Sequence, residues 1–253
     1  MPVKIHPAVI AVWAAVVAAS NLIPTIPIWG GGVFTFSHIL SPLSGILFGP
    51  IAGALCSATG GFIGSLIAPH TATLLGLGTF IIPAVTAFTT GCVAWGTWPP
   101  ITVTARGNLV VNGGIIIYAI GTILWFTQEV GRSLIIFPLV FYGAGCAALI
   151  IGSIFAGKIL SGTNTALKFP AVWFCVFGGL IGGASINNFF WQVLRQFPRE
   201  IWIPLVFVAP AERAFFSLGA AVVCVPLLAG LHKIGIFAGP QVESNEQLVI
   251  NDE

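Results

Sequence analysis

The chain has 253 residues, of which 57% are hydrophobic and only 6% are charged, and its formal net charge is +2. No Lys, Arg, Asp or Glu occurs between Lys4 and Arg106. Charged residues supply about a quarter of a soluble globular domain, so this composition excludes one. The few basic residues are scattered and form no patch that would bind nucleic acid. Long apolar runs without strand-like alternation predict an all-α integral membrane protein.

Eight apolar segments follow one another along the chain, each near the roughly 20 residues with which a helix crosses a bilayer. They cover residues 7–22, 35–48, 51–67, 80–98, 109–126, 134–159, 170–190 and 210–231. Gly49 and Pro50 alone join the second segment to the third, which predicts a tight antiparallel hairpin. Residues 200–208 are apolar but contain Pro204, so we expect an interfacial segment there that leads into the last helix, which begins at Pro210, rather than a membrane span.

The basic residues divide between two sides when the eight segments alternate across the membrane. Arg132, Arg195 and Arg199 fall on one side. The other side holds every lysine, and we assign it to the cytoplasm. That larger group consists of Lys4, Arg106, Lys158, Lys168 and Lys233. We therefore predict one transmembrane domain over residues 1–241, a polar tail over residues 242–253, and both termini in the cytoplasm.

Small residues recur at four-residue spacing on three of the predicted helices. Such faces let helix backbones approach closely, which drives helix association in lipid. The residues are Ala11, Ala15 and Ala19 on the first helix, Gly53, Ser57, Gly61 and Ser65 on the third, and Gly178, Gly179, Gly182 and Gly183 on the seventh. Two interpretations stay open, namely packing within one bundle and docking to another membrane subunit.

No catalytic or nucleotide-binding motif occurs in the sequence, since it lacks the P-loop, HExxH and GxSxG patterns. The five cysteines lie in apolar runs without a paired spacing, which is typical of buried core residues rather than of metal ligands. We therefore expect no enzyme activity, no catalytic residue, no cofactor and no metal site.

Polar residues are densest near the outer end of the seventh segment. Asn188, Trp191 and Gln192 follow i, i+3, i+4 spacing and share one helical face, with Asn187 beside it. Amides both donate and accept hydrogen bonds, and tryptophan adds a flat apolar surface. This face is a candidate ligand site, and an ordinary interfacial belt of Trp and Arg is the alternative.

Glu212 and His38 are two further candidates for ligand binding. Glu212 is predicted in the first turn of the last helix, where it either complements the helix dipole or faces a cavity. His38 stands in the half of the chain that lacks charge, either as a hydrogen-bonded core histidine or as a ligand group.

Residues 26–68 read IPIWGGGVFTFSHILSPLSGILFGPIAGALCSATGGFIGSLIA. Together with the alanine-spaced first helix, this stretch resembles the substrate-binding S components of energy-coupling factor (ECF) transporters for vitamins and micronutrients. The resemblance rests on a Pro/Gly-containing loop, an L-x-G-x-x-x-G-P turn at residues 43–50 and a small-residue third helix. Residues 134–233 look like the last three helices of that family. Residues 71–126 depart from it, because they add two helices to a usual total of six.

The resemblance implies a six-helix core that binds its ligand near the outer face, under the loop between the first two helices. Trp29 in that loop would then be a ligand group together with Asn188, Trp191, Gln192 and Glu212. The face of Ala11, Ala15 and Ala19 would dock onto a membrane T component driven by two ABC-type ATPases. The implied function is substrate binding for an ECF-type uptake transporter of a vitamin or micronutrient.

Two rival classes remain. One is a non-catalytic accessory or anchor subunit of a larger membrane complex, which small-residue faces fit equally well. The other is a stand-alone facilitator or channel, which needs a polar path across the whole membrane. The first 100 residues offer only hydroxyl groups and one buried histidine for such a path.

Overall fold

The structure is a computed structural model that describes residues 6–27, 33–69, 76–95, 101–104, 108–111, 113–236 and 238–240. These residues are almost entirely helical, as the sequence predicts. The helices are α1 (Pro7–Ser20), α2 (Ser37–Phe48), α3 (Pro50–Ile67), the 3₁₀-helix η2 (Gly76–Phe80), α4 (Ile81–Ala94), α5 (Gly113–Thr127), α6 (Glu129–Ser133), the π-helix η3 (Pro138–Tyr142), α7 (Gly143–Ser161), α8 (Thr165–Arg195) and α9 (Arg199–Lys233). Antiparallel hairpins pair β1 (Pro24–Pro27) with β2 (Val33–Thr35) and β3 (Ile101–Thr104) with β4 (Asn108–Val111).

Four of the described helices are long and apolar enough to cross a membrane. They are α3, α8, α9 and the continuous helix that η3 and α7 form together. The other apolar helices are shorter, with 10–17 residues each. Length and composition therefore support a membrane protein, with four candidate spans among the eight segments predicted from the sequence.

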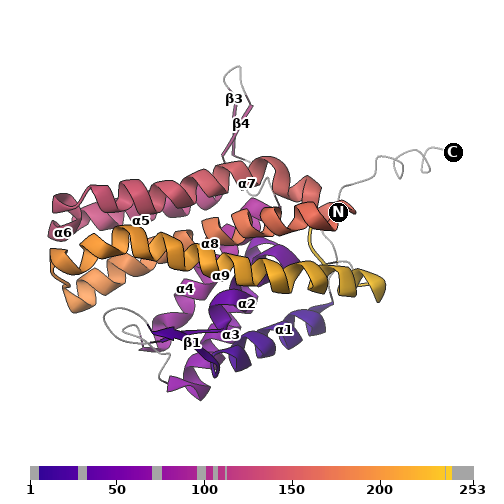
Figure 1. The fold of residues 1–253 in the computed structure, drawn as a ribbon. Helices are drawn as coiled ribbons and strands as arrows, with labels where there is room; N and C mark the ends of the chain where they lie inside the picture. The colour runs from indigo at the N-terminus through magenta and orange to yellow at the C-terminus, as the bar shows by residue number, and fades with distance from the viewer. Residues whose placement is uncertain are drawn as a thin grey trace.

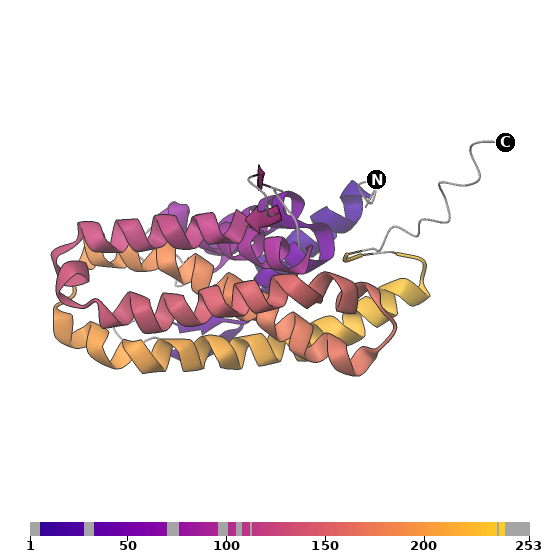
Figure 2. The same cartoon turned by 90° about the horizontal axis from the view of Figure 1, so that it is seen from above.

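The helices form two groups, as Figure 1 and the view from above in Figure 2 show. The long helices α5, α7, α8 and α9 run side by side, and α1–α4 pack along one flank of them. The α5–α7 and α8–α9 turns lie at one end of the bundle, and the end of α9 lies at the other. Arg132, Arg195 and Arg199 stand in helix turns at the first end, and Lys158 and Lys233 at the second, as predicted.

The tight joint between α2 and α3 is confirmed. Gly49 ends α2 with a φ of 85°, which side-chain-bearing residues rarely adopt, and it also precedes the first residue of α3. Pro50 occupies that first position, where its missing N–H costs no helical hydrogen bond. The two helices pack against each other after this joint.

Helix α4 lies at the centre of the molecule, although it belongs to the region that departs from the ECF pattern. It contacts α2, α3, α7 and α8, and its second half is buried. Glycine allows the closest approaches: a Cβ on Gly91 would lie 2.7 Å from the backbone of Pro50. Gly179 and Gly183 of α8 leave similar room for Thr90 and Thr86 of α4.

The small-residue faces of α3 and α8 therefore pack within the bundle. On α3, Gly53 faces the backbone of α2, and Ser57 donates a 2.8 Å hydrogen bond to the carbonyl of Ser41. The first helix differs, because Ala14 and Ala18 are buried whereas Ala11, Ala15 and Ala19 are exposed. No described part of the chain covers that second alanine face.

Three predicted helix starts were wrong, and the first of them is that of α2, which begins at Ser37 because Thr35 lies in β2. Helix α9 runs without interruption from Arg199, so residues 200–208 belong to it and Glu212 lies in its middle rather than in its first turn. Backbone hydrogen bonds have no substitute in an apolar environment, and this favours a continuous helix despite Pro204 and Pro210. The fifth helix begins at Gly113, because Leu109 lies in β4.

Candidate functional site

A buried polar cluster joins the end of α1 to the start of α2. The side-chain oxygen of Asn21 accepts a 3.0 Å hydrogen bond from Ser37 and a 3.4 Å hydrogen bond from Thr35. The Asn21 amide donates to the carbonyl of Val17 at 3.0 Å. These bonds fix β2 and the first turn of α2 against α1, and so fix His38 one residue further on.

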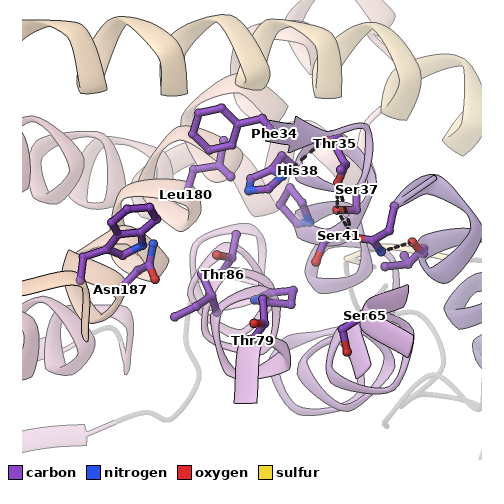
Figure 3. A pocket seen from close by; sticks show the side chains of 17 residues that line it. Phe34, Thr35, Ser37, His38, Ser41, Ser65, Thr79, Thr86, Leu180 and Asn187 are labelled. Atoms are coloured by element: carbon purple, nitrogen blue, oxygen red, sulfur yellow. Dashed lines mark hydrogen bonds between the residues drawn. The ribbon is translucent and has the colours of Figure 1, made fainter. Parts of the chain in front are cut away.

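The first cavity lies beside this cluster, between α2, α3, α4 and α8 (Figure 3). The empty space between its side chains is about 830 Å³, parts open to solvent included. Asn187 of α8 stands on one side, and His38 and Ser41 of α2 stand across from it. The other lining residues are Val17, Asn21, Phe34, Thr35, Ser37, Pro42, Gly61, Ser65, Thr79, Ile82, Pro83, Thr86, Leu180 and Trp191.

Most polar atoms around this cavity come from hydroxyl and amide groups. The Nδ1 atom of His38 lies 3.3 Å from the carbonyl of Thr35. The buried Oγ of Ser41 has no hydrogen bond to any residue that the structure describes. A buried hydroxyl without a partner costs free energy, so a small movement that let Ser41 bond a molecule in the cavity would be favoured.

A second cavity lies between α8, α9 and η3. Its empty space is about 640 Å³, again with parts open to solvent. Its lining is Phe34, Phe137, Phe141, Asn187, Asn188, Trp191, Phe197, Ile201, Trp202, Leu205, Ala209, Glu212 and Arg213. The two cavities share Phe34, Asn187 and Trp191, so these three side chains separate two neighbouring spaces.

Phe34 is the central side chain of this partition. Its ring meets the His38 ring edge to face, with centroids 4.7 Å apart, and the Phe216 ring at 5.2 Å. The guanidinium carbon of Arg213 lies 4.8 Å from the centroid of the same ring. The Phe34 ring thus contacts both His38 of the first cavity and Arg213 of the second.

Glu212 and Arg213 form the charged end of the second cavity. Their nearest side-chain atoms are 3.5 Å apart, and the side chains are 21% and 13% exposed. The Nη1 atom of Arg213 is buried and has no hydrogen bond to a described residue. This end therefore carries two opposite charges, and the arginine has one buried N–H group without an acceptor among the described residues.

Aromatic side chains build the opposite end of the second cavity. Trp125 stacks on Phe137 with centroids 4.8 Å apart, and Trp202 meets both rings. Gln192 supports this packing, because its amide oxygen accepts a 2.8 Å hydrogen bond from the Trp202 indole. Gln192 is buried with this partner and lines neither of these two cavities, but it lines a third one near the α8–α9 turn, so its predicted role in ligand binding stays a prediction.

The structure brings together most of the residues predicted from the sequence as ligand groups. Asn187, Asn188, Trp191 and Glu212 line the second cavity, and His38 lines the first with Asn187 and Trp191. The Asn188 amide also donates a 3.4 Å hydrogen bond to the Tyr142 hydroxyl. Trp29 lies outside the described residues.

Sequence reasoning missed Phe34, Asn21 and the role of Arg213 in the site. Phe34 stands in an apolar stretch where one aromatic residue has no distinguishing pattern. Asn21 ends an alanine-rich helix, and an isolated amide next to such a run was a usable signal. Arg213 directly follows Glu212 in the sequence, and no motif there indicates a role of its own.

The described residues contain no group of three or more His, Cys, Asp or Glu side chains that could hold a metal ion. The five cysteines all lie within the described residues, and none of them forms a disulfide bond. No known family, curated protein or solved structure matches the chain. The functional argument therefore rests on the geometry of the two cavities and on the exposed faces of the helices.

Proposed function

We propose that the protein is a substrate-binding membrane subunit, of the S-component type, in an ECF-like uptake transporter for a vitamin or another micronutrient. The observation that carries this proposal is the convergence of Asn187, Asn188, Trp191 and Glu212 on one cavity next to the β1–β2 hairpin. A mostly apolar cavity with a few placed polar groups is the usual form of a small-molecule site.

The position of the cavities supports binding from one side of the membrane. Both cavities share Phe34 of β2, and β2 belongs to the connection between α1 and α2. The resemblance places the ligand under that connection. The arginine-bearing end of the bundle would then face outward, and the lysine-bearing end and both termini would face the cytoplasm.

The exposed face of α1 supports a docking role. Ala11, Ala15 and Ala19 are exposed, and neighbouring Val12 is 65% exposed. A flat small-residue face lets a partner helix approach closely. In the proposal, this face meets a membrane T component, and two ATPases drive the complex because the chain has no nucleotide-binding motif of its own. The full membrane architecture would be eight spans, six of them forming the S-component-like core.

The proposal is tested by the small molecules that stay bound to the purified protein. The full chain, extracted in mild detergent, is compared with its Asn188→Ala variant by mass spectrometry of released compounds. We expect one compound in amounts close to those of the protein, and strongly reduced amounts in the variant. If the intact protein releases no enriched compound and binds none from a panel of micronutrients, the alternative of a non-catalytic anchor subunit replaces the proposal.

A further inference from the structure

Arg213 poses a physical problem that the described residues do not solve. An arginine keeps its charge in proteins and carries five N–H donors. Its side chain is only 13% exposed, and buried Nη1 has no hydrogen bond to a described residue. The Glu212 carboxylate lies 3.5 Å away without completing that bond.

Phe34 stabilises the charge of Arg213 but cannot accept a hydrogen bond from it. The cation–π contact, at 4.8 Å, stabilises the positive charge but offers no acceptor to the N–H groups. Burying a charged donor without an acceptor is costly, so a molecule that brings an anionic oxygen to Nη1 is favoured. Arg213 lines the second cavity, and a turn of its guanidinium group would present the buried Nη1 to an oxygen bound there.

The walls of the same cavity indicate what the rest of the molecule is. Six aromatic side chains line it, among them Trp191, Phe197 and Trp202. Such side chains favour flat apolar rings, which they meet by stacking or edge to face. Ile201 and Glu212 both line the cavity and lie eleven positions apart on α9. At a rise of about 1.5 Å per residue, their backbones are about 16 Å apart along the helix axis. The cavity is therefore elongated, with aromatic walls at one end and charge at the other.

We propose that the second cavity binds an aromatic monocarboxylate, whose carboxylate accepts hydrogen bonds from Arg213 and whose ring lies among the tryptophan and phenylalanine side chains. This names the substrate class of the proposed transport subunit and rests on that function. A single negative charge fits best, because a doubly charged phosphate would be repelled by Glu212 beside Arg213.

The test uses 2-naphthoate and its uncharged amide, 2-naphthamide, which have nearly the same shape. Isothermal titration calorimetry on the full chain in detergent measures binding of each. We expect 2-naphthoate to bind at least about tenfold more tightly, as a hydrogen bond to a charged group allows. Arg213→Met should abolish this preference. Arg195→Met, which removes an exposed arginine from the end of α8, should retain it.

The Glu212→Gln variant supplies an independent check, because it keeps Arg213 and removes the competing carboxylate. We expect it to bind 2-naphthoate more tightly than the unmodified chain, because the like charge beside the carboxylate of the ligand is gone. Weaker binding by a folded Glu212→Gln variant would overturn the proposal, and this comparison holds even if Arg213→Met fails to fold. The proposal is overturned if the unmodified chain does not bind 2-naphthoate or binds acid and amide alike, or if folded Arg213→Met keeps the preference. A co-purified neutral compound retained by Arg213→Met would overturn this substrate class and leave the transport function standing.

Discussion

Phe34 links the polar groups of the candidate site, although nothing in its sequence neighbourhood marks it. It lines both cavities and touches His38, Phe216 and Arg213. An aromatic side chain in this place excludes water from the charged end of the second cavity, and this strengthens the electrostatic interactions there. The amide groups of α8 then provide the directional hydrogen bonds.

Asn188→Ala should weaken binding of the co-purified compound without unfolding the protein. Loss of one hydrogen-bonding partner inside a cavity costs about 1–3 kcal/mol, which corresponds to a dissociation constant that is roughly five- to 150-fold larger. Asn164→Ala is the matched control, because Asn164 caps the start of α8 at an exposed position. It should lower the free energy of unfolding by about 0.5–2 kcal/mol and leave binding unchanged. Equal binding losses in the two variants would contradict the assigned role of Asn188.

The elements of this protein are held in place by close backbone contacts and unusual joints. Gly49 both ends α2 and precedes α3, and its φ of 85° with a ψ of 176° is a conformation that only glycine adopts readily. Helix α9 tolerates three internal prolines over 35 residues. Local rules therefore predict the α2–α3 joint correctly but place the start of α9 too late.

Gly49→Ala should destabilise the fold by about 1–3 kcal/mol through backbone strain. Steric overlap is not the cause, because the added Cβ would lie 3.6 Å from the Trp95 ring, an ordinary contact. The free energy of unfolding is measured by titrating the detergent-solubilised protein with a denaturing detergent and following its helical circular dichroism.

Gly143→Ala is the control for this prediction, since Gly143 begins α7 with no atom within 4 Å of the added methyl group. It should be neutral or stabilise the protein by up to about 1 kcal/mol, as alanine does within helices. A Gly49→Ala variant as stable as Gly143→Ala would show that the joint relaxes to another conformation.

Helices α4 and α1 have different positions in the whole molecule, one central and one at the surface. Helix α4 sits in the centre, where the Thr and Gly residues of α4 and α8 pack against each other. Helix α1 packs through Ala14 and Val17 against Gly60 of α3, and it leaves its other alanine face uncovered. In the proposed membrane architecture, the exposed alanine face of α1 contacts either lipid or another subunit.

Ala15→Leu should abolish co-purification of a membrane partner while the protein still folds and binds its ligand. A branched side chain separates two helices that would otherwise nearly touch, and such overpacking costs about 1–3 kcal/mol. Ala147→Leu is the control, because Ala147 is also exposed but lies on α7. A partner that stays bound to Ala15→Leu would mean that the α1 face contacts lipid, and the docking proposal would fail.

The sequence by itself determined the helical class, the apolar segments and the α2–α3 joint. It also determined that Arg132, Arg195 and Arg199 lie at the opposite end of the bundle from Lys158 and Lys233. These properties depend on composition, on the length of hydrophobic runs and on local backbone chemistry, and all three can be read from residues that are close together in the sequence. It also placed Asn187, Asn188 and Trp191 near one another, because helical spacing alone puts them within two turns.

Only the tertiary structure decided which of these groups share a cavity. Gln192 lies one helical turn after Asn188 on the same face of α8. It is nevertheless buried with Trp202, a partner ten residues away across the α8–α9 turn. Phe34 and Arg213 meet although 179 positions separate them in the numbering, and no periodic pattern reports such a contact. Packing between distant helices sets these pairs, because it depends on the shapes of both surfaces and not on either segment alone.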